Sequence, residues 1–170
     1  MKKTTSIFLI LLFLIFQSCS KRNDNSSTTP TGNYSWSCKV NNVAYSWSGS
    51  SGATNVGGGA CQYNPQTAAF SLLMSNSSSG IVISMLIPEY KKSTFILDGL
   101  FGQSKYAANL TFANPSQTYY TIAPNKVTLI VEEALNNKIS GTFYGSLGAV
   151  VPGTTGSVSI TEGKFTLQTY

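Results

Sequence analysis

The chain contains no histidine, and only 10% of its 170 residues are charged, whereas about 25% is typical of soluble proteins. Without histidine, Ser-His-Asp and Cys-His nucleophilic systems are excluded, and so is nearly every zinc enzyme site. The few carboxylates are scattered along the sequence, which favours neither a glycosidase pair nor a calcium-binding loop. We therefore expect a protein that is not an enzyme and that uses no metal or cofactor.

Positive charge is equally scarce in the part of the chain that can form a domain. From residue 34 onward the sequence has seven lysines and no arginine against five acidic residues, a balance of +2. Nucleic-acid-binding domains carry a much stronger basic footprint, so a nucleic-acid partner is not expected. The single basic pair, Lys91-Lys92, is typical of a solvated strand edge.

Apolar residues form only one long run, residues 7–16. Ten residues of helix span about 15 Å, roughly half of a bilayer core, so a permanent transmembrane helix is not expected. Two lysines precede the run and small or polar residues follow it, which is the arrangement of a secretory signal. The cysteine directly after Ser18 resembles a bacterial lipobox. We therefore expect residues 1–18 to be a lipoprotein signal peptide that is removed, and Cys19 to carry the lipid, palmitate included, that anchors the protein to a membrane.

The mature chain is expected to have two parts. Residues 19–33 are polar after the cysteine, and such a composition predicts a flexible tether. Residues 34–170 have the length of a single domain with one core. Hydrophobic residues make up 42% of the whole chain, which is enough to fill that core.

The domain is predicted to open with a β-hairpin. Large side chains alternate with small or polar ones on both sides of Asn41-Asn42, and asparagine tolerates the positive φ that a two-residue type I′ turn requires. Such a turn puts all seven large side chains on one face, namely Tyr34, Trp36, Cys38, Val40, Val43, Tyr45 and Trp47. It also places Trp36 opposite Trp47, so we expect both tryptophans to pack in the core and not to form a sugar-stacking platform.

Alternating or apolar segments predict short strands along the rest of the chain. They cover residues 60–63, 68–75, 80–87, 94–97, 105–113, 119–122, 126–132, 139–144 and a last hairpin at 158–167 with its turn at Glu162-Gly163. The segment 80–87 is apolar on both faces and is expected at the centre of a sheet. Matching the faces of 126–132 and 139–144 requires a loop with an odd number of residues, such as 135–137.

The spacing of these segments predicts the fold class. No helical periodicity is present, and turn signals recur at the intervals found in sandwiches. The sequence therefore predicts an all-β fold, an antiparallel β-sandwich or flattened barrel of about nine or ten short strands.

Cys38 and Cys61 remain as an even pair once Cys19 is assigned to the lipid. In an exported domain such a pair can form a disulfide, which the chain-entropy model values at roughly 3 kcal/mol. We therefore expect a Cys38–Cys61 disulfide. The alternative is a buried free thiol, because the alternation of the first strand places Cys38 on the core face.

Three segments have a recognisable form. Residues 36–45 read Trp-Ser-Cys-Lys-Val-Asn-Asn-Val-Ala-Tyr, residues 138–143 read Lys-Ile-Ser-Gly-Thr-Phe, and residues 156–165 read Gly-Ser-Val-Ser-Ile-Thr-Glu-Gly-Lys-Phe. The first resembles the opening hairpin, and the other two the ending, of a small Bacteroidota-type lipoprotein family of unknown function. The resemblance spans roughly residues 34–170, and its middle is poorly matched. It implies no functional residue beyond the lipidated cysteine.

Two functions fit these observations. The first is a lipid-anchored lipoprotein of the cell envelope, on the periplasmic or surface side of the outer membrane, that binds a glycan or an envelope protein without catalysis. The second is a purely structural envelope lipoprotein or a subunit of a surface complex. For binding, we expect loops and strand ends to make the contacts, at residues 48–59, 90–92, 102–106 and 119–120. Tyrosine stacks on and hydrogen-bonds ligands, so the candidate ligand-binding residues are Tyr90, Tyr119 and Tyr120.

Overall fold

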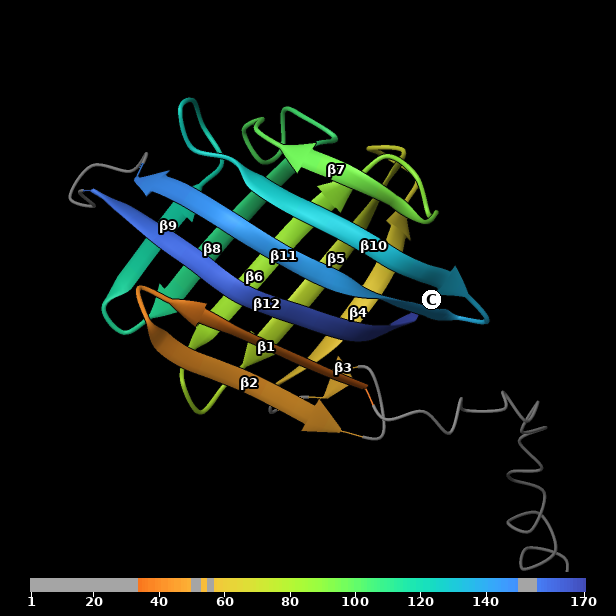
Figure 1. Cartoon of the computed structure of the whole chain (residues 1–170), viewed down its shortest axis with the longest axis horizontal. Helices are drawn as coiled ribbons and strands as arrows, with labels where there is room; N and C mark the ends of the chain where they lie inside the picture. The colour runs from red at the N-terminus through yellow and green to blue at the C-terminus, as the bar shows by residue number, and fades with distance from the viewer. Residues whose placement is uncertain (1–33, 50–52, 55–56, 150–155) are drawn as a thin grey trace, which may run out of the picture.

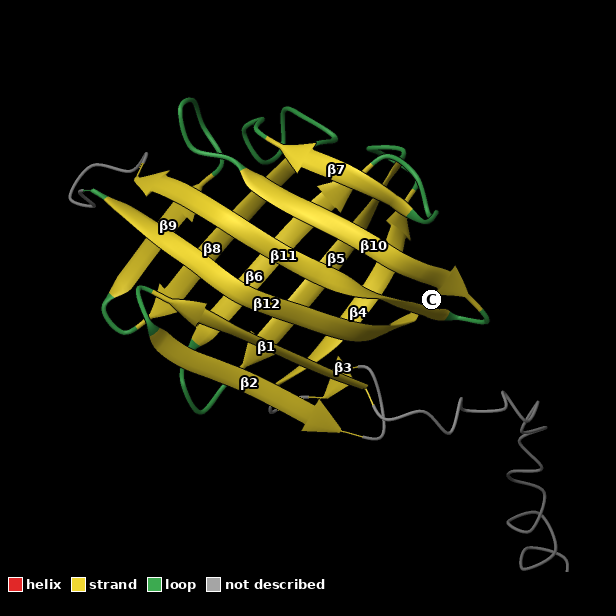
Figure 2. Cartoon of the chain, in the orientation of Figure 1, coloured by secondary structure: helices red, strands yellow, loops and turns green. Residues whose placement is uncertain are grey.

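The computed structural model describes residues 34–49, 53–54, 57–149 and 156–170, in which the chain forms strands and connecting loops without a helix (Figure 2). This confirms the predicted all-β class. In the same residues there is accordingly no helix with the length and apolar character needed to cross a membrane. The predicted signal peptide, Cys19 and the tether lie outside the described residues.

Twelve strands follow one another along the described chain. They are β1 (Tyr34–Val40), β2 (Val43–Gly49), β3 (Ala53–Thr54), β4 (Gly57–Asn64), β5 (Ala69–Asn76), β6 (Ile81–Ile87), β7 (Ser93–Leu97), β8 (Ala107–Ala113), β9 (Ser116–Tyr120), β10 (Val127–Leu135), β11 (Lys138–Ala149) and β12 (Ser157–Thr169). The prediction of about nine or ten short strands is therefore too low. It is also wrong in length for the last two strands, because β11 has 12 residues and β12 has 13.

The strands form one continuous sheet that folds into two crossing layers (Figure 1). The front layer contains β7, β10, β11, β12, β1 and β2 in that order, and the back layer contains β9, β8, β6, β5 and β4, with β3 beside β4. Two corners join the layers, where β12 pairs with β4 and β11 pairs with β9. The β12–β4 pairing is parallel, and the other pairings between described strands are antiparallel. Because β11 also pairs with β12, the sheet closes on itself, as expected for a sandwich or flattened barrel.

The inward faces of the two layers supply a single core. Leu129 and Phe143 point inward from the front layer and Leu72 and Leu110 from the back layer, and each is at most 1% exposed. Burying one such side chain contributes roughly 1.5–3 kcal/mol. Strand β6 lies between β5 and β8, and even its outward-facing Leu86 is only 6% exposed. The central position predicted for this segment is confirmed.

The first hairpin forms as predicted. Asn41 and Asn42 have φ values of 47° and 67°, and the turn they make pairs Trp36 with Trp47. Trp36 is only 2% exposed, which confirms that it packs in the core. Trp47 is half-buried, because β2 is the edge strand of the front layer and pairs with no strand other than β1 in the described part of the chain.

The turn predicted between β10 and β11 is wrong. Asn136 and Asn137, with φ values of 52° and 57°, form a two-residue turn that pairs Leu135 with Lys138. The faces still match because the register shifts in the strand, between Val131 and Glu133. A β-bulge accommodates one extra residue in this way. The extra residue that we expected in a loop with an odd number of residues is therefore accommodated inside β10.

The predicted hairpin at 158–167 is also wrong. These residues stay in the single strand β12, and Glu162, with φ 54°, lies in a bulge opposite Cys38. The bulge moves the buried positions from even numbers, such as Ile160, to odd numbers, such as Phe165. A turn and a bulge produce the same change of parity. Gly163 lies in the same bulge. Glycine is required at this position because a Cβ atom there would collide with the carbonyl and ring of Phe143.

Candidate binding site

Two rows of mostly hydroxyl-bearing side chains cross the outward face of the front layer. Directly paired residues of neighbouring strands point to the same side of a sheet. The register therefore aligns one row across β2, β1, β12 and β11 as Ser48, Ser35, Thr166 and Ser140, and the next row as Ser46, Ser37, Lys164 and Thr142. Alternation sends Trp36, between Ser35 and Ser37, to the core side.

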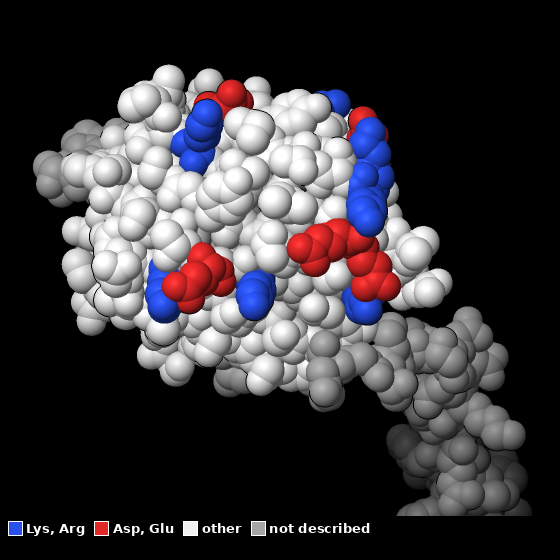
Figure 3. Space-filling model, in the orientation of Figure 1, with Lys and Arg blue, Asp and Glu red and all other residues white. Residues whose placement is uncertain are grey.

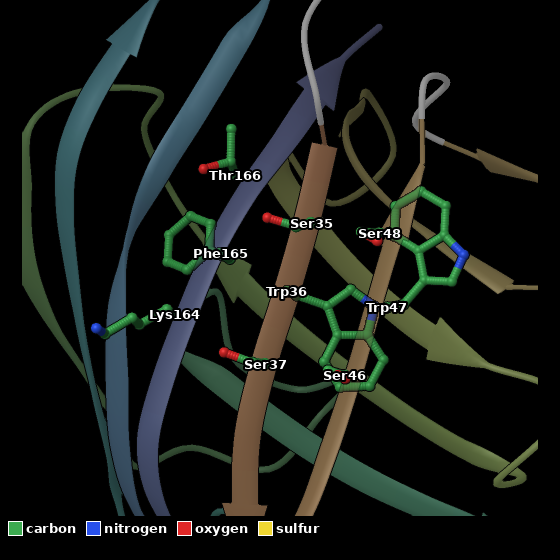
Figure 4. A pocket seen from close by; sticks show the side chains of 9 residues that line it. All are labelled: Ser35, Trp36, Ser37, Ser46, Trp47, Ser48, Lys164, Phe165 and Thr166. Carbon is green, nitrogen blue, oxygen red and sulfur yellow. The ribbon is translucent and has the colours of Figure 1, made fainter.

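The part of these rows on β2, β1 and β12 lines a trough of about 570 Å³, which we call the hydroxyl trough. Its outward side chains are Ser35, Ser37, Ser46, Ser48, Lys164 and Thr166. In Figure 4 the hydroxyls of Ser35 and Ser37 point toward β12, and the Trp47 indole lies on the other side of β1. None of the five hydroxyls has a side-chain hydrogen bond to another described residue. A hydroxyl both donates and accepts, so the trough offers both kinds of group to a ligand.

Ion pairs flank the hydroxyl trough on both sides. Lys39 contacts Glu162 at 2.7 Å, and Lys138 contacts Glu133 at 2.8 Å. The hydrogen bond from Lys138 holds the pKa of the Glu133 carboxyl below its ordinary value. In Figure 3 the charge on this side of the molecule is confined to small groups of neighbouring basic and acidic residues, and the areas between these groups are uncharged. Within the described residues, Lys164 has no carboxylate within ion-pair distance.

The three tyrosines chosen from the sequence are not brought together as a site. Tyr119 is 7% exposed and packs edge-on against Phe112 in the core, with ring centroids 6.3 Å apart. A residue in that position cannot meet a ligand, so this choice was wrong. The assignment failed because Tyr119 lies inside strand β9 with its ring on the inward face, and not at a loop.

Tyr90 and Tyr120 are half-buried and lie apart from each other in the fold. The Tyr90 hydroxyl donates a 2.7 Å hydrogen bond to the carbonyl of Lys138, and its ring lies 5.7 Å from that of Phe70. Burial raises the pKa of this phenol. Tyr90 thus already has a structural role, which is to fasten the β6–β7 connection to the front layer. Tyr120 is in the outward row of the back layer, paired with Asn109.

Cys38 and Cys61 are buried free thiols, and the disulfide considered from the sequence is not formed. Cys38 faces the bulge of β12 at Glu162, whereas Cys61 pairs with Thr169 near the end of that strand. Six or seven residues of strand separate these levels by about 20 Å, far beyond the roughly 7 Å that a disulfide allows between Cα atoms. Burial raises the pKa of each thiol to about 12.

No group of three or more Cys, Asp or Glu side chains in the described part of the chain is placed to hold a metal ion.

Sequence reasoning missed two residues that the fold places beside the hydroxyl trough. Lys164 lies within residues 158–167, for which the sequence predicted a hairpin that does not form, and Tyr144 is the last residue of the predicted strand 139–144. Tyr144 is 50% exposed and lies on the outward face of β11, two residues beyond Thr142. The signal was present in the alternation of the strands, because the positions opposite to the core positions define the outward face. What the sequence did not indicate is which strands lie next to one another.

Comparisons of the chain with protein-family models, with curated proteins and with solved structures found no match. The geometry of the hydroxyl trough and the N-terminal sequence are therefore the features of this chain that bear on its function.

Proposed function

We propose that the protein is a lipid-anchored lipoprotein of the cell envelope and that its β-sandwich is a non-catalytic binding module for a glycan. The observation that supports this proposal is the hydroxyl trough, in which five hydroxyls without side-chain partners in the described structure share one concave surface of about 570 Å³. Sugars present hydroxyls that also both donate and accept, so each group can exchange a water for a ligand hydroxyl.

The position of these hydroxyls on strands favours binding. Neighbouring strands lie about 4.8 Å apart, and the sheet holds each serine in place before the ligand arrives. A preorganised surface loses less conformational entropy on binding than a loop does. The trough is part of a strand face, whereas from the sequence we expected loops to make the contacts. The candidate site moves from the loops to a strand face because β2 and β12 both pair with β1, and the three strands together form the trough.

A glycan array with the purified full chain tests the proposal. Ser37→Tyr places a large side chain in the hydroxyl trough, and a strand tolerates tyrosine. Ser71→Tyr is the matched control, since Ser71 is also half-buried and also faces outward, but on β5 of the back layer. We expect the wild type and Ser71→Tyr to bind the same glycans and Ser37→Tyr to lose them. Equal binding by all three proteins, or binding by none, would contradict a glycan site in the trough.

A structural role is the second candidate, and the outward face of the back layer favours it. Strands β4, β5, β6, β8 and β9 contain no charged residue, and Leu73 on this face is 44% exposed. Depletion of charge is typical of the centre of a protein interface. If the protein is a subunit of a complex, Leu73→Lys should release it from that complex on a native gel of envelope extract. An unchanged complex, or none in the wild type, would remove this alternative.

A further inference from the structure

Lys164 lies on β12, at one side of the hydroxyl trough, and is the one cation among its lining residues that no carboxylate neutralises within the described structure. Its direct neighbours across the sheet are Ser37 on β1 and Thr142 on β11, both uncharged. The next lysine on this face, Lys39, is 2.7 Å from Glu162 and is therefore neutralised. A ligand that enters the trough therefore meets, among the described residues, a single available positive charge with hydroxyl groups on the neighbouring strands.

Tyr144 places an exposed aromatic ring beside this charge. It is the next outward residue after Thr142 on β11, and Thr142 pairs with Lys164. The register between β11 and β12 shifts between Phe143 and Gly145, so Tyr144 lies opposite the β12 bulge at Glu162, two residues along β11 from the Thr142–Lys164 pair. Two residues of strand span about 7 Å, within reach of aromatic and long side chains. A tyrosine ring can stack on the apolar face of a sugar ring while its hydroxyl remains in water.

We propose that the ligand of the hydroxyl trough is an acidic saccharide of the uronic-acid class, whose carboxylate pairs with the ammonium group of Lys164. This inference rests on the proposed glycan-binding function and names the class of glycan. The ring that carries the carboxylate stacks on Tyr144, and the neighbouring unit hydrogen-bonds Ser37 and Ser46. The chain of sugars runs across the strands, along the row in which Ser46, Ser37, Lys164 and Thr142 are aligned.

The same residues favour a saccharide over an acidic peptide. A peptide with several carboxylates would need several unpaired cations, and the described trough has one. An extended peptide bound by strand addition would need a free strand edge, whereas the trough lies on a strand face. The lining instead consists mostly of hydroxyls, which match the hydroxyls of a sugar and leave one position for its charge.

Binding of matched oligosaccharides by the full chain tests the inference. The probes are oligomers of galacturonate, glucuronate-containing chains and alginate, each together with its carboxyl-reduced counterpart, which keeps the sugar backbone and removes the charge. We expect each recognised acidic oligomer to bind about fivefold or more tightly than its reduced form, with an affinity that falls as salt is added. Lys164→Gln should abolish this preference and Lys164→Arg should retain it. Tyr144→Ala should weaken both forms, because stacking does not depend on charge.

Lys105→Gln is the control, because Lys105 is an exposed lysine of the β7–β8 connection and forms no ion pair among the described residues. Equal affinity for acidic and reduced oligomers, unchanged by Lys164→Gln, would overturn the inference while leaving the glycan-binding function intact. Binding of a poly-glutamate peptide in place of the oligosaccharides would also overturn it. No binding of any charged or neutral glycan would contradict the proposed function itself. Thermal melting shows whether the variants remain folded, and because Lys164 is exposed and forms no ion pair with another described residue, we expect no change in melting temperature.

Discussion

The indole N–H of Trp36 donates a 3.1 Å hydrogen bond to the carbonyl oxygen of Gly58, and this bond joins β1 of the front layer to β4 of the back layer. Both residues are buried. Trp36→Phe keeps an aromatic ring but leaves the buried carbonyl without its donor, which costs about 1–3 kcal/mol. We expect a loss of this size in the free energy of unfolding measured by urea titration. Trp47→Phe is the comparison, since its ring is half-buried and donates no hydrogen bond to another described residue, and it should cost clearly less. An equal cost at the two positions would argue against the bond.

The burial of Cys38 and Cys61 leads to a second prediction, which concerns their reactivity. Cys38 is 3% exposed and Cys61 is 0% exposed, so neither should react with a thiol reagent at pH 8 while the domain is folded, and both should react after denaturation. Burial raises each pKa to about 12 from a value of 9.0, which adds a further reason for low reactivity because the thiolate is the reactive species. Rapid labelling of the folded domain would show that the core opens readily or that the thiols are accessible.

The same pKa shifts predict how stability changes in alkaline solution. Above about pH 9 the unfolded chain releases its thiol protons, whereas the folded chain keeps them until about pH 12. The folded state then holds more protons, so stability falls as pH rises, by up to about 1.4 kcal/mol per pH unit for each thiol. Below pH 9 the contribution is fully present. The double variant Cys38→Ala/Cys61→Ala should show a shallower decline between pH 9 and 10.5 than the wild type. If the stability of the wild type and of the double variant declined in parallel, the two thiols would not be the cause of the alkaline loss of stability.

The fold class and the first hairpin were predictable because their signals are local. Alternation over residues 34–48 and the two asparagines of the turn determine the register of β1 and β2 without help from the rest of the chain. The bulges at Val131–Glu133 and at Glu162 were not predictable in the same way. A bulge and a turn both change the parity of the buried positions, and only the neighbouring strand decides between them. Glu162-Gly163 was therefore read as a turn, although β1 and β11 on either side hold β12 in one piece.

The candidate site was less predictable than the fold because it depends on strand order. Ser46, Ser37, Lys164 and Thr142 come from four strands, and β12 is far from β1 in the sequence. Their outward direction follows from alternation, but their alignment in one row follows only from the pairing of β1 with β12. The tyrosines were chosen for their residue type, and Tyr119 shows the weakness of that choice. Its ring points inward from β9, where alternation along a short strand gave too little information.

Thr121 provides a test of the connection between β7 and β8. Its side chain is fully buried and its hydroxyl accepts a hydrogen bond from the Ala108 N–H at 2.8 Å and donates one to the Gly99 carbonyl at 2.8 Å. Thr121→Val keeps the shape but leaves these two groups without a partner, so we expect a loss of about 2–4 kcal/mol. Thr121→Ser keeps the hydroxyl and should recover most of it. Hydrogen exchange at the Ala108 amide should accelerate in the valine variant alone. If both variants lose the same stability, the methyl group and not the hydroxyl is responsible.

Cys19 provides the test of the predicted membrane anchor. In a bacterium that processes lipoproteins, we expect the wild type to lose residues 1–18 and to incorporate an alkyne-tagged palmitate. A single acyl chain binds a membrane only marginally, whereas two or more anchor a protein stably, so the labelled protein should also remain with the membrane after a high-salt wash. Cys19→Ala should incorporate no label and should keep its signal. Cys38→Ala and Cys61→Ala are the matched controls, because those buried thiols are no substrates for acylation, and both should label as the wild type does. Label retained by Cys19→Ala, or lost from either control, would show that the lipid is attached elsewhere and that the lipobox interpretation is wrong.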